Sequence, residues 1–337
     1  MMTSRPVADP TPVNIAPRRR YNPLLRFILR APEASIAAVG VILVIVFEIL
    51  SSNFLTNDNI STVSQFFAPW ALIACGEIML LICGEVDLSV GQVFALAPFV
   101  MYFVTAAGLP LFAGVIVALI VSAFLGLCIG LITVMFGVAS FITSLGALLL
   151  INGLTLTLSG GFPINTPDTP LASILGGWPY SEILWAIGIA LVLHGVLRNT
   201  RWGLHTIAVG GNPTGAAEAG IHIKKIKIGN FMLCSMLGGF AGILNAFHVT
   251  SIDPNAGGSN VMFLAIASSV IGGTSLLGGS GTIIGGLVGA AVLGILQDGF
   301  TLLGINAFTF DIITGTAILI TMITNVQFAK LRQRNRI

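Results

Sequence analysis

Polar residues and glycines interrupt two long apolar runs, and these interruptions are where chemistry or gating is expected. The first is the octapeptide GEVDLSVG, which places carboxylates at Glu85 and Asp87, a hydroxyl at Ser89 and a glycine at Gly91. Because carboxylates at membrane depth are costly, we expect this segment at the membrane interface or beside a wet cavity, with a gating or coupling role. The alternative is a short cytoplasmic turn in which Asp87 caps the following helix.

The second interruption, residues 272–281, reads GGTSLLGGSG and holds five glycines. Each glycine weakens a helix interior by about 1 kcal/mol relative to alanine, so we expect a breakable turn between helices that approach closely. A phosphate-binding loop is the competing interpretation, but the chain has no Walker A motif. The residues expected to gate or line a pathway are Glu85, Asp87, Ser89, Gly91, Thr143, Gly272, Gly273, Ser275, Gly278 and Gly279.

The two interruptions also match each other, since Gly-x-x-Asp-Leu-x-x-Gly at 84–91 aligns with Gly-x-x-Ser-Leu-x-x-Gly at 272–279. Paired broken helices of this kind are typical of transporters with internal repeats. Both copies are expected to face the cytoplasm, which predicts a parallel repeat. The match is short, so coincidence is the competing explanation.

A third unusual segment is the basic loop 199–227, which contains GGNPTGAAEAG. Asn212 is a good N-cap, Pro213 suits the first helical position, and Gly220 is a natural stop. So short a helix needs a partner to hold its shape; the alternative is a loop that binds anionic headgroups through its lysines. The residues expected to couple to a partner are Gly210, Gly211, Asn212, Pro213, Ala216, Ala217, Glu218 and Gly220.

The elements that must position these segments are transmembrane helices. The 337 residues are 55% hydrophobic and only 8% charged, too few charges to cover a soluble surface. Long unbroken apolar runs predict an all-α, polytopic helical bundle of about ten membrane segments. The runs at 90–107 and 260–276 are short and predict broken helices. The expected segments are 34–52, 65–83, 90–107, 110–135, 138–158, 182–198, 228–249, 260–276, 282–300 and 306–326.

The fifteen lysines and arginines form three clusters: before the first segment, around loop 199–227 and after the last segment. Even numbers of segments separate the clusters, so the positive-inside rule places both termini and loop 199–227 in the cytoplasm. The loops 53–64, 159–181 and 250–259 are expected outside. The predicted organisation is a cytoplasmic tail at 1–30, a membrane domain at 31–329 and a cytoplasmic tail at 330–337.

Other polar residues lie in or near apolar segments. Glu48, Asp298 and Asp311 are near predicted ends and are expected at the interface, whereas Glu77 lies deeper. The four cysteines lie in apolar runs and predict packing rather than a disulfide or metal site. Side chains that could bind substrate hydroxyls are Gln65, Thr143, Asn152, Asn245 and Gln297.

Four stretches resemble signatures of one family and occur in its order. Residues 84–91 resemble GE(I/V)DLSVG, and residues 139–146, ASFITSLG, resemble PFI(V/A)TLG with Ala-Ser where Pro is commoner. Residues 200–221 resemble its T.FG…A.GGN..AA..SGI loop, with Trp202 for Phe and Ala219 for Ser, and residues 272–281 resemble GGTSL.GG.G. The chain is thus similar to the ribose-type permeases of ABC importers for monosaccharides and the autoinducer-2 furanose.

The resemblance implies that the chain forms the translocation pathway for a monosaccharide or similar small polyol in the bacterial cytoplasmic (inner) membrane. Its implied partners are membrane lipid, a second permease copy or sister chain, an ABC ATPase subunit that uses ATP and Mg²⁺, and an extracytoplasmic sugar-binding protein. The chain itself would bind no cofactor and no nucleic acid and would perform no covalent chemistry. The helix at 212–220 would be the coupling helix, seated in a groove of the ATPase.

Two other functions compete. An ion-coupled secondary transporter would use Glu77, Glu85 or Asp87 as its titrating group, and its uptake would survive ATP depletion but not an ionophore. An intramembrane enzyme would need clustered catalytic or metal-binding side chains, and the apolar segments show no such spacing.

Overall fold

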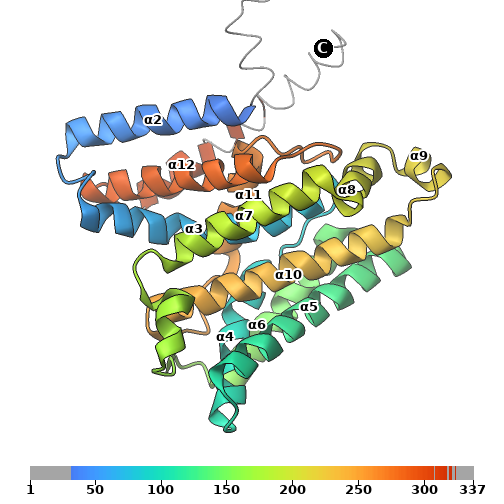
Figure 1. The fold of residues 1–337 in the computed structure, drawn as a ribbon, viewed down its shortest axis with the longest axis horizontal. Helices are drawn as coiled ribbons and strands as arrows, with labels where there is room; N and C mark the ends of the chain where they lie inside the picture. Colours follow the sequence, from blue (N-terminus) through green and yellow to red (C-terminus); the bar gives the residue numbers. More distant parts are fainter. Residues whose placement is uncertain (1–31, 307, 317–318, 321–322, 324–337) are drawn as a thin grey trace, which may run out of the picture.

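The computed structural model describes residues 32–306, 308–316, 319–320 and 323. Both expected tails, 1–30 and 330–337, and the second half of the expected segment 306–326 lie largely or wholly outside these residues. Within the described residues the chain is a bundle of helices (Figure 1). The longer helices are α2 (Pro32–Leu50), α3 (Asn57–Ile82), α4 (Val90–Ala106), α5 (Leu111–Phe136), α6 (Ser140–Ser159), α7 (Ser181–Asn199), α8 (Arg201–Gly211), α10 (Ile223–His248), α11 (Gly258–Ile271) and α12 (Ile283–Leu302).

Short elements complete the described chain. They are β1 (Ile164–Asn165), η1 (Pro170–Ala172), η2 (Ser173–Gly177), α9 (Pro213–Glu218) and β2 (Ser251–Ile252). Residues 308–316 are also helical. Among the described residues, seven helices are long and apolar enough to cross a membrane, and α4 and α11 are shorter apolar helices. The prediction of an all-α membrane bundle with two short helices is confirmed.

Helices α3 and α10 form the centre of the bundle. In both, most of the residues in the most apolar stretch are buried, whereas α2 exposes most of its surface. The two helices run antiparallel, because Met79 of α3 contacts Asn230 of α10 while the earlier Glu77 contacts the later Cys234. Gly76 allows this close approach, since a Cβ there would lie 2.6 Å from Cys234 Cα.

Helix α4 begins deep in the bundle. A Cβ on Gly242 of α10 would lie 1.9 Å from the Phe94 carbonyl oxygen of α4, and Gly242 is about 9 Å below the outer end of α10 at 1.5 Å per residue. Segment 84–91, which was expected at the membrane interface or beside a wet cavity, therefore runs inward into the bundle over its second half. Gly84 and Glu85 stay at the end of the bundle where the basic loop 199–227 lies, which is called the cytoplasmic end below. Asp87 and Ser89 are fully buried.

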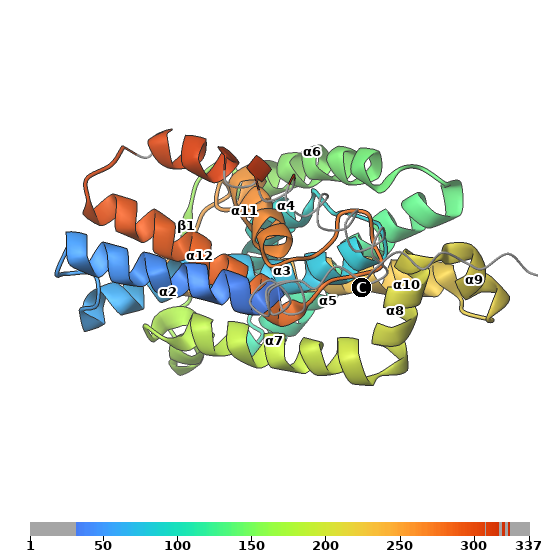
Figure 2. The ribbon, with the colours of Figure 1, turned by 90° about the horizontal axis from the view of Figure 1, so that it is seen from above.

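Helix α11 begins at the same depth and against α4. A Cβ on Gly91 would lie 2.1 Å from the Gly258 carbonyl oxygen, and one on Gly257 would lie 2.5 Å from the Gly91 carbonyl oxygen. No side chain larger than hydrogen fits between the two helix starts. From this contact α4 runs outward and α11 runs toward the cytoplasmic end, with α11 lying between α12 and α4 (Figure 2).

The bundle contains an inverted repeat, so the predicted parallel repeat is wrong. Helix α10 packs against α4 and α5, and α3 packs in the same way against α11 and α12. One copy of the repeat is α3, a loop, the short helix α4 and the long helix α5. The other copy is α10, a loop, the short helix α11 and the long helix α12, and it runs in the opposite direction across the membrane. The structural counterpart of 84–91 is the segment before α11, at 250–258, and not the glycine-rich loop 272–281.

The loops expected outside and the basic residues lie at opposite ends of the bundle. At one end the three loops expected outside meet: Ile164 pairs with Ile252 across β1 and β2, and Gln65 of α3 donates to the Pro179 carbonyl oxygen. The described lysines and arginines gather at the opposite end, around α8 and the start of α10. We refer to that end as the cytoplasmic end.

Candidate functional site

Three glycine-containing segments meet at the cytoplasmic end and form what we call the glycine junction: Ile82–Gly84 after α3, Gly210–Gly211 at the end of α8, and Gly278–Gly279 before α12. The Gly279 amide donates to the Ile82 carbonyl oxygen at 2.8 Å. A Cβ on Gly210 would lie 1.5 Å from that same oxygen and 2.7 Å from the Gly279 nitrogen. The junction therefore joins the basic loop to both interruptions identified in the sequence.

Next to the glycine junction, Asn230 of α10 forms hydrogen bonds with α8 and with the end of α3. It is fully buried, and its side-chain oxygen accepts a hydrogen bond from Trp202 Nε1 of α8 at 2.8 Å. Its Nδ2 contacts the Met79 carbonyl oxygen, Cys83 Sγ and Thr206 Oγ1 at 3.1–3.2 Å. One amide thus connects α8, α10 and the end of α3, and a buried amide with all its polar atoms bound specifies a single arrangement.

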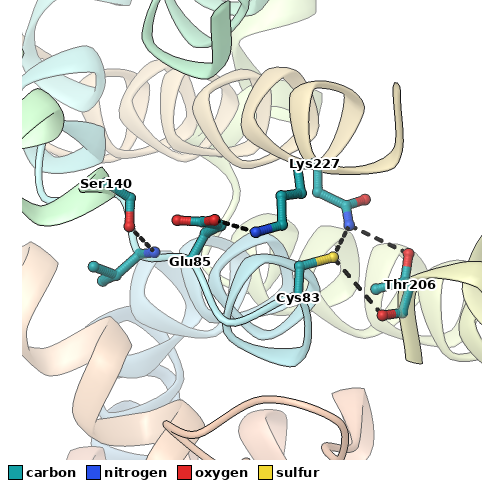
Figure 3. Close-up of polar contacts among 7 residues, drawn as sticks. Cys83, Glu85, Ser140, Thr206 and Lys227 are labelled. Atoms are coloured by element: carbon teal, nitrogen blue, oxygen red, sulfur yellow. Dashed lines mark hydrogen bonds and ion pairs between the residues drawn. The ribbon is translucent and has the colours of Figure 1, made fainter. Parts of the chain in front are cut away.

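An ion pair continues this network along the interruption after α3. Lys227, near the start of α10, bonds Glu85, and the Val86 amide donates to Ser140 Oγ at the start of α6 (Figure 3). The side chains of Lys227 and Glu85 are only 21% and 12% exposed. The segment 84–86 is therefore held by α10 on one side and α6 on the other.

Replacing Lys227 by alanine is expected to destabilise the protein by about 1–3 kcal/mol, because the poorly solvated Glu85 carboxylate loses its charged partner. Thermal unfolding of the detergent-solubilised protein measures the effect. Lys225→Ala is the matched control, since Lys225 is exposed and two residues away. Equal melting temperatures for both variants would show that the ion pair contributes nothing.

Deeper in the bundle, two carboxylates meet polar groups of α10. Asp87 accepts hydrogen bonds from Ser89 N and Oγ at 2.9 and 2.6 Å and from Ser235 Oγ at 3.2 Å. Glu77 is also fully buried, and Cys234 Sγ lies 3.5 Å from its Oε1. Asp87 therefore fixes the turn before α4 onto α10, and the contact with Ser235 of α10 was not foreseen from the sequence.

Helix α9 projects beyond the junction at one extremity of the molecule (Figure 1). Asn212 caps it as predicted, because its Oδ1 accepts from the Gly215 amide at 3.0 Å. Ala216 is buried against Cys83, Val209 and Ile226, whereas Pro213, Ala217 and Glu218 are exposed. The helix thus packs on a small apolar cluster through Ala216 and leaves its other faces exposed.

Comparison with known proteins decides the family. Residues 59–322 match the family described as the permease component of branched-chain amino acid transport systems. The chain belongs to this permease family. No solved structure matches it.

Several curated proteins are similar to this permease over most of their length. The xylose/arabinose import permease protein XylH of Sulfolobus acidocaldarius is 35% identical over 88% of this chain and 85% of its own. The ribose import permease protein RbsC of Escherichia coli K12 is 34% identical over 87% and 93%. The probable ABC transporter permease protein y4mJ of Sinorhizobium fredii is 33% identical over 89% and 91%. The resemblance drawn from the sequence is confirmed.

Not all the predicted gating residues of the permease come together. Gly278 and Gly279 lie in the glycine junction and Glu85 beside it, but Asp87, Ser89 and Gly91 lie deeper in the bundle. Gly272 packs elsewhere, since a Cβ on it would lie 2.4 Å from the Gly285 carbonyl oxygen of α12. The remaining three residues are bonded within their own segments. The Gly273 amide donates to the Val270 carbonyl oxygen, and the Ser275 amide donates to the Ser280 carbonyl oxygen. The Thr143 hydroxyl lies 3.4 Å from the Ala139 carbonyl oxygen.

Sequence reasoning missed the residues of the permease that join the segments. Asn230 stands alone among apolar residues, and a polar side chain in such a run is itself a signal that could have been used. Lys227 was considered only as part of a basic cluster, because the sequence does not show that α10 passes Glu85. Ser140 and Ser235 carry no signal that separates them from other serines in helices.

Proposed function

We propose that this chain is the membrane-spanning permease subunit of an ABC importer and forms the translocation pathway for a monosaccharide or similar small polyol in the cytoplasmic (inner) membrane. The names of its relatives support the substrate class, since they import ribose or xylose and arabinose. In this proposal a separate ATPase uses ATP and Mg²⁺, a binding protein delivers the sugar at the outer face, and a second permease copy completes the pathway.

The observation that carries the proposal is the position of α9. It is an exposed, capped helix on the basic side of the bundle, and α8 connects it directly to the glycine junction. A partner that moves α9 would move the ends of α3 and of loop 272–281 with it. This is the arrangement that an external motor needs in order to act on the spans.

Glu218→Lys tests the coupling role. Glu218 is exposed on α9 and its side chain makes no hydrogen bond within the described residues, so the variant is expected to insert and fold normally. Reversing its charge in the docking surface is expected to lower sugar-stimulated ATP hydrolysis and uptake by about tenfold, because a charge mismatch in an interface costs affinity.

The measurement is uptake and ATPase activity in proteoliposomes that contain the permease with its co-purified ATPase. Asn199→Lys is the matched control, because it adds positive charge at the same end of the bundle but outside α9. Full activity in Glu218→Lys would remove α9 from the coupling surface. A permease that purifies without an ATPase and still transports, in a manner abolished by an ionophore, would favour the secondary transporter instead.

A further inference from the structure

The facing starts of α4 and α11 leave an unusual set of polar groups within the membrane. Ser259 and Asn260, in the first turn of α11, are exposed on the chain and make no side-chain hydrogen bond within its described part. Their depth follows from Gly257 and Gly258, which pack on α4 at the level of Gly242 of α10. Polar side chains at this depth do not face lipid chains; they face protein or a water-filled path.

Gln92 of α4 points to the same place. Its side chain is 8% exposed and makes no hydrogen bond in the described residues. Its Nε2 lies 3.6 Å from the position that a Cβ on Gly258 would occupy. The amide is thus directed at the start of α11 with its hydrogen-bonding capacity unused.

The backbone adds donors to this group. The residue before α11, Gly257, has no side chain to cap the helix, so the first amide groups of α11 lack a side-chain acceptor. Helix starts that meet at the centre of a membrane protein, at the interface between its repeats, are a recurrent place for substrate binding.

No lysine or arginine of the described chain lies at this site, so the site lacks the cation that an anionic substrate would need. The lysines and arginines of the described chain lie at the cytoplasmic end, near the start of α10, whereas Gly242 lies toward the other end of that helix. They are Arg198, Arg201, Lys224, Lys225 and Lys227. Amides, a hydroxyl and backbone N–H groups offer both donors and acceptors, which suits an uncharged ligand with many hydroxyls.

We infer that Gln92, Ser259 and Asn260, with the first turn of α11, form a hydroxyl-binding constriction that selects an uncharged monosaccharide within the pathway. This inference rests on the proposed function, and it places part of the substrate selectivity in the permease itself. The inverted repeat explains the location, because the two short helices bring their starts to one point only at the middle of the bundle.

Uptake of radiolabelled D-ribose, D-xylose and L-arabinose by the complete importer tests the site. Asn260→Ala and Gln92→Met are each expected to change uptake of the preferred sugar, and its ratio to the other two, by about two- to tenfold, the effect of losing one neutral hydrogen bond. Thr157→Ala is the matched control, since its exposed hydroxyl bonds its own helix at the Gly153 carbonyl oxygen. Unchanged ratios in both variants, with active wild type, would overturn the site and leave the proposed function standing.

A second measurement does not depend on the choice of sugar. Asn260→Cys is expected to react with a charged, membrane-impermeant thiol reagent, and the transported sugar is expected to slow that reaction. Val41→Cys, on the exposed apolar face of α2, is expected to stay unreactive. An unreactive Asn260→Cys would show that no water reaches the start of α11 and would refute the site. A wild-type complex that imports none of the three sugars would instead refute the proposed sugar function, and the hydroxyl-binding inference with it.

Discussion

Gly210→Ala is expected to abolish transport, whereas Gly211→Ala, one residue along, is expected to leave it nearly unchanged. The added Cβ at Gly210 would overlap the Ile82 carbonyl oxygen at 1.5 Å and approach the Gly279 nitrogen at 2.7 Å. Both are backbone atoms, so no side-chain rotation relieves the overlap, and α8 must separate from the end of α3. At Gly211 the nearest atom would be 3.9 Å away, an ordinary contact.

The measurement is uptake together with the melting temperature of the purified permease. We expect Gly210→Ala to lose about 3 kcal/mol or more of stability, at the upper end of overpacking costs, and at least about tenfold in uptake. Gly211→Ala controls for helix propensity, because both changes replace a glycine in the last turn of α8. Equal behaviour of the two variants would mean that α8 and α3 are not in contact in the working protein.

The sequence was sufficient to predict the class of fold, whereas the orientation in the membrane stays a prediction. Apolar runs of membrane-spanning length and three basic clusters depend only on composition along the chain, and the lipid environment imposes both patterns strongly. The short helices α4 and α11 were also predicted, because their runs are visibly short. The capped helix α9 was predicted because Asn212, Pro213 and Gly220 act locally.

The sequence did not predict how deep individual residues lie in the bundle or which segments contact each other. Asp87 was expected in a gating segment or as the cap of a short turn, but the sequence did not show that the chain turns inward there and buries it against Ser235 of α10. The sequence paired 84–91 with the wrong segment. Residues 272–279 match 84–91 in glycine spacing, but residues 250–258 occupy the equivalent position in the fold. Glycines mark close approaches in general, so their spacing alone does not identify which helices meet.

The inverted repeat and the glycine junction together suggest how movement could spread. The centre of the bundle, α3 against α10, is closely packed through Gly76, and the short helices meet through Gly91 and Gly258. Under the proposed function, a displacement of α8 would be transmitted as movement of whole helices, because contacts of this kind leave little room for gradual deformation. The polar start of α11 is then linked to α9 through α3 and α10.

Asn230→Leu is expected to be the most damaging substitution of a single polar side chain in this network. Leucine has similar volume but leaves the Trp202 indole N–H without its acceptor, and it removes the contacts of Nδ2 with the Met79 carbonyl oxygen, Cys83 Sγ and Thr206 Oγ1. Unpaired buried polar groups cost about 1–3 kcal/mol each, so we expect a loss of about 2–4 kcal/mol and a weaker hold of α8 on the bundle.

Thermal unfolding and coupled ATPase activity measure this effect, with Asn199→Leu as the control for the same replacement at an exposed position of the cytoplasmic end. Trp202→Phe removes the donor of one bond and should cost less than Asn230→Leu. If the two act through the same contact, the double variant should be less destabilised than the sum of the single changes. Additive effects would mean that the indole and the amide stabilise the protein independently of each other.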